Sequence, residues 1–212
     1  MQWLQYAWPR VFQLLAEHLI LTVPAVLLSI LIAVPLGLLA ARRPRAGGAV
    51  LSVSTLLYCI PALPLVVILP ALIGIPLRSR TTIILALCVY GTALLVRTAS
   101  DAFRSVPADA RVAALAVGTS PRQLFWRVDL PLAVPVLISG IRVITVSTVS
   151  LVTIGALVGV PSLGSLFTDG FQRGIVVEVL VGIVTVVLLA LVLDGLCQLT
   201  GKALAPWQGR LR

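Results

Sequence analysis

Charged residues are scarce in this chain, and their scarcity argues against most soluble folds. Only 11% of the 212 residues are charged, whereas 59% are hydrophobic and the mean hydropathy is +1.12. Soluble globular domains are about 45–50% apolar and about 25% charged. Uncharged stretches longer than 20 residues separate the charges, as in chains that cross a membrane. The composition therefore predicts an all-α, polytopic membrane protein rather than a soluble enzyme or a disordered chain.

Groups that carry catalysis or bind metals are also rare. His18 is the only histidine, and Cys59, Cys88 and Cys197 lie singly in apolar stretches. One histidine is too few for a His-rich metal site and argues against a Ser–His–Asp site, and no C-x-x-C spacing is present. We expect no catalytic residue, no metal and no cofactor on this chain, and we expect His18 to be a partly solvated, interfacial imidazole.

Five apolar segments are long enough, or nearly so, to cross a bilayer. About 20 helical residues span a hydrocarbon core of about 30 Å at about 1.5 Å per residue. The first segment is too long for the apolar part of a signal peptide, so we expect it to remain as an anchor. No water-soluble block stands out elsewhere, so residues 1–212 are expected to form one transmembrane domain. The predicted spans are residues 19–41, 49–77, 81–96, 136–160 and 175–193.

The basic residues predict an orientation, because cytoplasmic loops carry an excess of arginine and lysine. They lie between the apolar runs rather than on one amphipathic face, so the net charge of +9 does not indicate a nucleic-acid partner. With the connection after the first span placed inside, eleven basic residues lie inside and four outside. The inner set is Arg42, Arg43, Arg45, Arg97, Arg104, Arg111, Arg122, Arg127, Lys202, Arg210 and Arg212, and the outer set is Arg10, Arg78, Arg80 and Arg173. The N-terminus is thus predicted outside and the C-terminus in the cytoplasm.

Aromatic side chains gather before the first predicted span, at Trp3, Tyr6, Trp8 and Phe12. Tryptophan and tyrosine are enriched where a membrane meets water. We therefore predict an amphipathic helix that lies on the outer membrane surface ahead of the first span. Within the spans aromatics are few, chiefly Tyr58 and Tyr90, which argues against an aromatic cage for a quaternary ammonium group.

The second predicted span carries prolines at positions 61, 64, 70 and 76. Each proline removes a backbone N–H, so we expect the helix to break or kink. Irregular backbone inside a membrane is tolerated only where protein or a water-filled cavity satisfies it. Pro61 and Pro64 are therefore candidate pathway-lining residues, the alternative being a kink that only helps packing. Thr145 and Thr148 of the fourth span are further candidates, although hydroxyls that bond their own helix are the commoner explanation.

The connection between the third and fourth spans, residues 98–132, is long, and its sequence contains signals for the start and the end of helices. Pro107, Asp109 in a first helical turn and Gly118 as a stop predict a short helix over residues 108–117. Such a helix below the membrane would form part of a rigid projection, and a rigid projection can transmit force to a soluble partner.

A second short helix is predicted directly after the first. Ser120 is a favourable N-cap, Pro121 suits the first helical position and Gln123 occupies the capping-box position. We expect this helix to run to about Leu130, where the prolines at 131 and 135 bend the chain into the fourth span.

The stretch from Pro107 to Pro135 resembles the EAA loop of ABC importer permeases. In that family the pattern is Glu-Ala-Ala, three residues and Gly, then about nine residues and a hydrophobic-x-Leu-Pro. Ala113 and Ala114 match the two alanines, Gly118 matches the glycine, and residues 130–131 match the closing Leu-Pro. Val112 stands where the family usually has glutamate, so we expect a modified contact rather than a lost one.

Further short motifs resemble the osmoprotectant subfamily, the carriers of glycine betaine, carnitine and choline, over roughly residues 18–200. They are Pro35-Leu36-Gly37, Ile60-Pro61, Arg97-Thr98, Gly140-Ile141-Arg142 and the segment 159–164. Methionine permeases also have five spans and a similar length, so an importer for methionine or another small solute stays an alternative. A secondary carrier and a membrane-embedded enzyme are more distant ones, because mid-membrane ionisable groups and nucleophile–base pairs are lacking.

The resemblance implies a type I importer with two permease chains, an ATPase dimer inside and a substrate-binding protein outside. The chain itself has no G-x-x-x-x-G-K-[ST] phosphate loop, so ATP and magnesium are expected on the partner ATPase. The resemblance also implies that the first short helix couples this chain to that ATPase in a bacterial inner membrane. The implied coupling residues are Ala108, Asp109, Arg111, Val112, Ala113, Ala114, Gly118, Thr119, Ser120 and Pro121.

Overall fold

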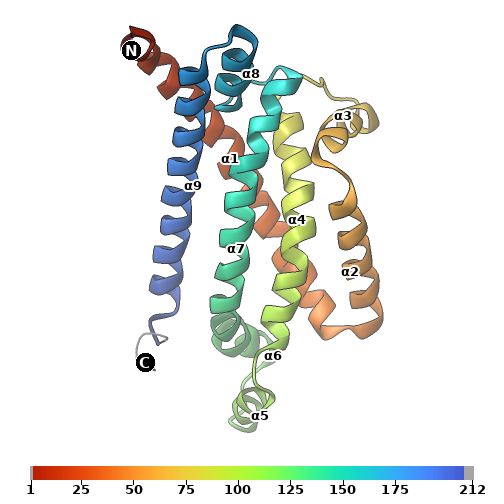
Figure 1. Ribbon diagram of the computed structural model, residues 1–212. Coiled ribbons are helices and arrows are strands. Elements are labelled where there is room, and N and C mark those ends of the chain that lie inside the picture. Colours follow the sequence, from red (N-terminus) through yellow and green to blue (C-terminus); the bar gives the residue numbers. More distant parts are fainter. Residues whose placement is uncertain (1, 208–212) are drawn as a thin grey trace.

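The computed structural model describes residues 2–207, with the side chains of residues 2–6 and 44 left aside. Four long helices cross between two ends of the molecule (Figure 1). They are α1 (Gln2–Arg42), α4 (Arg80–Arg104), α7 (Leu130–Val152) and α9 (Val176–Leu204). By length and composition the described part of the chain holds four candidate membrane spans, or five when the bent pair α2–α3 is one span. The all-α, polytopic architecture predicted from composition is confirmed.

Short elements mark the two ends, and these ends are named here after them. The α8 end holds α3 (Ala62–Ile73), α8 (Gly164–Arg173) and the start of α1 (Figure 1). The α5 end holds α5 (Ala108–Ala116), α6 (Pro121–Leu124) and the last turns of α9. The candidate coupling residues therefore project from one end only.

The first helix is one continuous rod, so the separate interfacial helix predicted before the first span is wrong. Val11 and Leu14 are buried in a cluster with Leu163, Leu166 and Leu189. This packing holds the N-terminal turns of α1 against α8 and α9 instead of leaving them on a membrane surface. Trp8 and Phe12 are exposed neighbours with ring centres 6.1 Å apart, whereas the side chains of Trp3 and Tyr6 lie outside the described set.

The second predicted span is broken, as its prolines indicate. The helix α2 (Pro44–Cys59) ends at Ile60, and α3 begins after Pro61 at an angle of 108°. Ile60 and Pro61 have extended backbone, with ψ of 123° and 140°. Two helical elements therefore replace the single predicted segment.

The central helix α4 packs against α1 and α7 through small residues. A Cβ added at Gly140 of α7 would lie 2.7 Å from the Thr98 methyl group, and one at Gly37 of α1 would lie 2.8 Å from the Ser100 nitrogen. Small residues allow membrane helices to approach closely where apolar lipid offers no hydrophobic drive for association. This close packing fixes the base of α4 from which α5 projects.

The helix does not end before the fourth span. From α6 the chain continues through a π-helical segment (Phe125–Asp129) into α7, with Pro131 in its first turn and Pro135 inside it. The Leu130 N–H donates to the Phe125 carbonyl five residues back, and this wider turn continues the helix up to Pro131. The predicted end of the second short helix at Leu130 is therefore wrong. A 3-10 segment (Thr153–Val158) follows α7.

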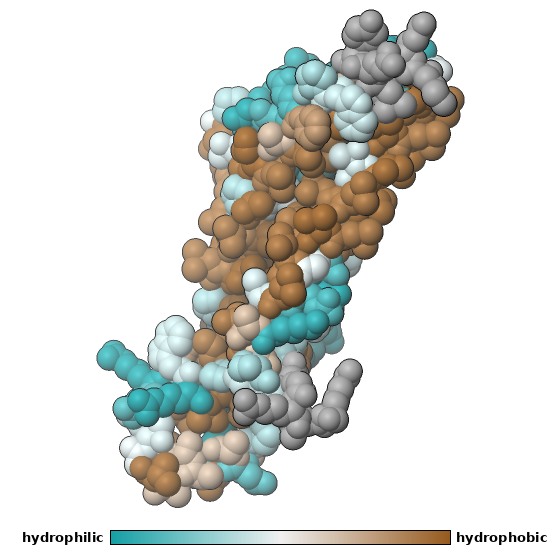
Figure 2. Space-filling view, turned by 90° about the vertical axis from the view of Figure 1, so that its left-hand side faces the viewer, coloured by the Kyte–Doolittle hydropathy of each residue, from teal (hydrophilic) through white to brown (hydrophobic). Residues whose placement is uncertain are grey.

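On the face shown in Figure 2, hydrophobic side chains cover the middle of the molecule between more hydrophilic ends. The helix α9 contributes leucine and valine side chains that are 50–62% exposed, among them Leu188, Leu191, Val192 and Leu199. Apolar side chains in such numbers on an outer surface are stable in lipid or against a second protein. This hydrophobic surface agrees with the multi-pass membrane location.

Candidate functional site

The projecting helix α5 ends at a glycine, as the sequence predicts. Gly118 has φ of +80°, its N–H donates to the Leu115 carbonyl, and the Thr119 N–H donates to the Ala114 carbonyl. These two bonds form a Schellman motif, in which the left-handed position favours glycine. The helix closes at Ala116 with Val117 as its cap, one residue earlier than predicted.

The predicted capping box follows immediately. The Ser120 hydroxyl accepts a hydrogen bond from the Gln123 N–H at 3.4 Å, and the Ser120 N–H donates to the Gln123 side chain at 3.1 Å. This reciprocal pair fixes the start of α6. The turn from α5 into α6 is thus fixed on both of its sides, by the end of α5 and by the start of α6.

None of the residues of α5 is buried. Val112, Leu115 and Val117 are apolar and 52–82% exposed. Figure 2 shows hydrophobic surface again at the lowest tip, below a hydrophilic band. Of the ten predicted coupling residues, Arg111, Ala114 and Thr119 are half-buried and the other seven are exposed: Ala108, Asp109, Val112, Ala113, Gly118, Ser120 and Pro121. An exposed apolar helix face at the end of a projection is suited to a groove on another protein.

A buried carboxylate connects this projection to the bundle. Asp129 is 2% exposed; its Oδ1 accepts from Arg111 Nε of α5 at 2.7 Å, and its Oδ2 accepts from Arg42 at the end of α1 at 2.8 Å. Arg111 also donates to the Phe103 carbonyl of α4 at 2.8 Å. We call Arg42, Arg111 and Asp129 the α5-end ion cluster.

The α5-end ion cluster fixes the position of α5 relative to two membrane helices, α1 and α4. Removing one partner of a buried ion pair leaves an uncompensated charge, which costs more than the net value of the intact pair. The Arg42 guanidinium also lies 5.9 Å from the centre of the Phe125 ring. The α5-end ion cluster therefore attaches α5 to α1 and α4 through charge-assisted hydrogen bonds.

Sequence reasoning missed Asp129 and Arg42 as members of the site. A signal was present, because Asp129 is the only acidic residue between Asp109 and Asp169. Its partner Arg42 lies 87 positions away, and no local pattern links the two.

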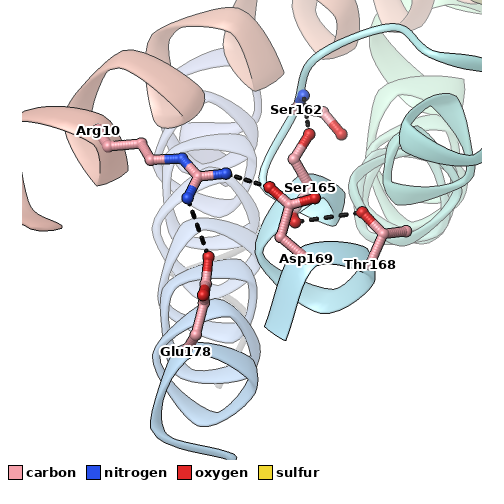
Figure 3. Close-up of polar contacts among 6 residues, drawn as sticks. All are labelled: Arg10, Ser162, Ser165, Thr168, Asp169 and Glu178. Carbon is pink, nitrogen blue, oxygen red and sulfur yellow. Dashed lines mark hydrogen bonds and ion pairs between the residues drawn. The ribbon is translucent and has the colours of Figure 1, made fainter. Parts of the chain in front are cut away.

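A second ion cluster, at the α8 end, has the opposite composition (Figure 3). The Arg10 guanidinium of α1 donates to Glu178 of α9 at 3.1 Å and also pairs with Asp169 of α8. Glu178 is fully buried, and its Oε2 has no hydrogen-bond partner among the described residues. We call Arg10, Asp169 and Glu178 the α8-end ion cluster.

Hydroxyls beside the α8-end ion cluster stabilise the start of α8 rather than add to the charges (Figure 3). The Ser162 N–H donates to the Ser165 hydroxyl at 3.4 Å, and the Thr168 hydroxyl donates to the Ser165 carbonyl at 3.2 Å. The cluster therefore joins three elements of the bundle to one another, and none of them projects from it.

The predicted pathway residues fall into two groups. Pro61 is exposed and Pro64 half-buried at the α2–α3 break. Thr145 and Thr148 are buried, and the Thr145 hydroxyl donates to the Ile141 carbonyl of its own helix at 2.7 Å. Thr145 also lines a mostly apolar cavity of about 170 Å³ between α1, α7 and α9. A lining role for these four residues stays a prediction.

Two other polar side chains form contacts inside the helix bundle. His18 is fully buried, with Nε2 3.0 Å from the Val149 carbonyl, so the interfacial, partly solvated imidazole expected from its position is wrong. Arg142 of α7 donates two hydrogen bonds of 2.7 Å to the Asp194 carboxylate of α9. Among the described residues, no group of three His, Cys, Asp or Glu side chains could hold a metal ion.

Comparison with known proteins adds to this geometry. Residues 33–205 match the family described as binding-protein-dependent transport system inner membrane component. The chain is 33% identical over 193 residues to the osmoprotectant import permease protein OsmW of Salmonella typhimurium, covering 90% of this chain and 89% of that protein. It is 27% identical over 190 residues to the choline transport system permease protein OpuBB of Bacillus subtilis, covering 90% and 86%.

A solved structure shares the fold. An inward-facing conformation of the MetNI methionine ABC transporter superimposes with a TM-score of 0.79 at 21% identity, covering 92% of this chain and 96% of that one. At this identity the likeness concerns the arrangement of helices alone.

Proposed function

Because the chain belongs to the family of binding-protein-dependent transport system inner membrane components, we propose that its translocation pathway carries an osmoprotectant such as glycine betaine, carnitine or choline. The chain is a permease subunit of an ABC importer. The substrate class rests on relatives, since the osmoprotectant permease OsmW and the choline permease OpuBB each align with 90% of the chain.

The proposed coupling mechanism rests on the way α5 is attached to the helix bundle. An exposed apolar helix at the tip is joined to α1 and α4 by the buried Asp129 and its two arginines. We propose that α5 docks in a groove of a separate ATPase, where Val112 supplies an apolar contact in place of the carboxylate usual at that position. Closure of the ATPase dimer on ATP and magnesium would then move α5, and with it α1 and α4, between inward-open and outward-open arrangements.

The remaining partners follow from the same proposal. A second permease chain would cover the other wall of the pathway, and a substrate-binding protein would deliver the solute at the α8 end. The α5 end would face the cytoplasm, with the N-terminus of the chain outside and its C-terminus inside. This orientation agrees with the excess of basic residues near the α5 end. Selectivity would rest largely on the binding protein.

The test is ATP-driven uptake into proteoliposomes that contain this chain with its ATPase and binding protein. Labelled glycine betaine is the substrate, and unlabelled choline, carnitine and methionine are the competitors. Uptake that needs all three components and is displaced by quaternary ammonium compounds is the expected result. Displacement by methionine alone would reject the substrate class, and failure to associate with any ATPase would reject the coupling mechanism.

A further inference from the structure

The two tyrosines of the membrane helices meet where α2 ends. Tyr58 is in the last turn of α2 and Tyr90 is in α4, and their ring centres lie 5.0 Å apart with the planes tilted by 42°. Tyr58 is 44% exposed, and its neighbours Cys59 and Pro61 are exposed as well. The sequence argued against an aromatic cage because aromatics are few, and 31 residues separate these two tyrosines along the chain.

The pair lies deep within the membrane segment. Tyr90 is ten residues into the 25-residue helix α4, or about 15 Å along a rod of about 37 Å at 1.5 Å per residue. Tyr58 is fourteen residues into α2, about 21 Å from its start. Each ring is therefore at least about 15 Å along its helix from the first residue of that helix, whereas a tyrosine that serves as an interfacial anchor lies at the membrane–water boundary.

The broken backbone beside the rings supplies partial negative charge. Pro64 has no N–H, so the Ile60 carbonyl loses its helical donor, and the Ile60 N–H turns back to the Leu57 carbonyl at 3.3 Å. The carbonyl end of α2 also carries the negative end of its helix dipole. Such backbone does not face lipid, because unsatisfied carbonyls are tolerated at this depth only beside protein or water.

From this juxtaposition we propose that Tyr58, Tyr90 and the carbonyl end of α2 form a transient binding site for a quaternary ammonium group. A tetraalkylated nitrogen has no N–H to donate, so aromatic faces and carbonyl dipoles are the groups that recognise it. From Pro44 to Ile73, Arg45 is the only charged residue, so no carboxylate in α2 or α3 holds the cation tightly. A neutral, weak site suits a solute that must leave again. The proposal rests on the proposed function for its substrate class.

A native thiol reports on the site directly. Cys59 follows Tyr58 and is exposed, whereas Cys88 is buried and Cys197 is half-buried. In the complete importer carrying Cys88→Ala and Cys197→Ala, Cys59 is left as the single thiol of this chain. Its rate of modification by a charged methanethiosulfonate reagent is measured with and without ATP. Tetramethylammonium and choline are the probes, and 3,3-dimethylbutan-1-ol is the uncharged isostere of choline.

Both cations are expected to slow Cys59 modification by about threefold or more at saturation, and the neutral alcohol is not. Tyr58→Leu and Tyr90→Leu are expected to abolish this protection, whereas Tyr58→Phe and Tyr90→Phe keep most of it because the ring face is retained. Equal protection by the alcohol, protection that survives in the leucine variants, or a thiol that stays unreactive with and without ATP would each overturn the site.

Uptake by the unmodified importer distinguishes failure of the tyrosine site from failure of the proposed osmoprotectant function. If the unmodified importer takes up glycine betaine and Tyr90→Leu transports as much per ATP hydrolysed as it does, the tyrosine site is wrong and the proposed function stands. If uptake of quaternary ammonium compounds is absent but cations still protect Cys59, the osmoprotectant assignment is wrong and a cation site remains.

Discussion

The two ends of α1 are held by ion clusters of opposite composition. At the α5 end one carboxylate, Asp129, lies between two arginines, and at the α8 end one arginine, Arg10, lies between two carboxylates. The first cluster attaches a helix that projects from the bundle, whereas the second joins α1, α8 and α9 within it. Similar interactions therefore join different parts of the molecule: the α5-end ion cluster attaches the projection, and the α8-end ion cluster joins elements of the bundle to one another.

The largest effect is expected from Asp129→Asn, which keeps the shape of the side chain and removes its charge. Arg42 and Arg111 would lose their common partner, so α5 would no longer move with α1. Uptake per ATP hydrolysed should fall by about tenfold or more, since each charge-assisted hydrogen bond contributes about 1.5–3 kcal/mol. The measurement compares ATPase rate and uptake in the same proteoliposomes.

Asp101→Asn is the matched control for this variant. Asp101 is an exposed carboxylate near the same end of α4, and among the described residues it forms no ion pair. Its uptake per ATP should stay unchanged. Equal losses in both variants would mean that surface charge at this end matters and the α5-end ion cluster does not.

A somewhat smaller loss is expected from Gly118→Val. A β-branched residue at φ of +80° is strained by about 1–2 kcal/mol, so the Schellman motif would open and α5 would change direction. Uptake should drop about five- to tenfold while membrane insertion is preserved. Gly48→Val, at a glycine with ordinary φ and open space around it, controls for added bulk. Normal transport in Gly118→Val would count strongly against the coupling role of α5.

Glu178→Gln tests the role of the α8-end ion cluster. The buried side chain would lose its charge interaction with Arg10, so the unfolding midpoint in detergent should fall by roughly 5 °C. Uptake per ATP in the folded fraction should not change, because the α8-end ion cluster carries no projecting element. Uncoupling without loss of stability would show that this cluster also takes part in the transport cycle.

The smallest effect is expected from Val112→Glu, which restores the carboxylate usual in the family. Val112 is 65% exposed and does not belong to either ion cluster, so the substitution should not affect folding. Uptake is expected to stay within about twofold, since a single exposed charge contributes at most about 1 kcal/mol. Failure to assemble with the ATPase would show that an apolar contact at this position is required.

Local features of the site could be predicted from the sequence because short-range chemistry decides them. The Gly118 stop, the Ser120 capping box and the break at Pro61 each depend on residues within a few positions, through a left-handed φ, a side-chain cap or a missing N–H. The sequence did not predict that the helix continues from the π-helical segment through Pro131 into α7, because a π-helical turn is set by the packing around it and not by proline alone.

Contacts between distant residues could not be predicted. The burial of His18, the bond of Arg142 to Asp194 and the meeting of Tyr58 with Tyr90 all depend on which helix faces come together. One chain offers no periodicity or spacing that specifies such pairs.

Local chemistry along the chain was enough to predict an all-α, membrane-spanning architecture with a short, capped projection. This is because apolar length, proline, glycine and capping chemistry act over a few residues at a time. The three-dimensional arrangement of the helices was needed to show that Asp129 links the projection to α1, that Arg10 closes the opposite end, and that two tyrosines pair at the broken span. Charge pairs and ring contacts act over a few ångströms in space, and folding alone brings residues 32 to 168 positions apart within that range.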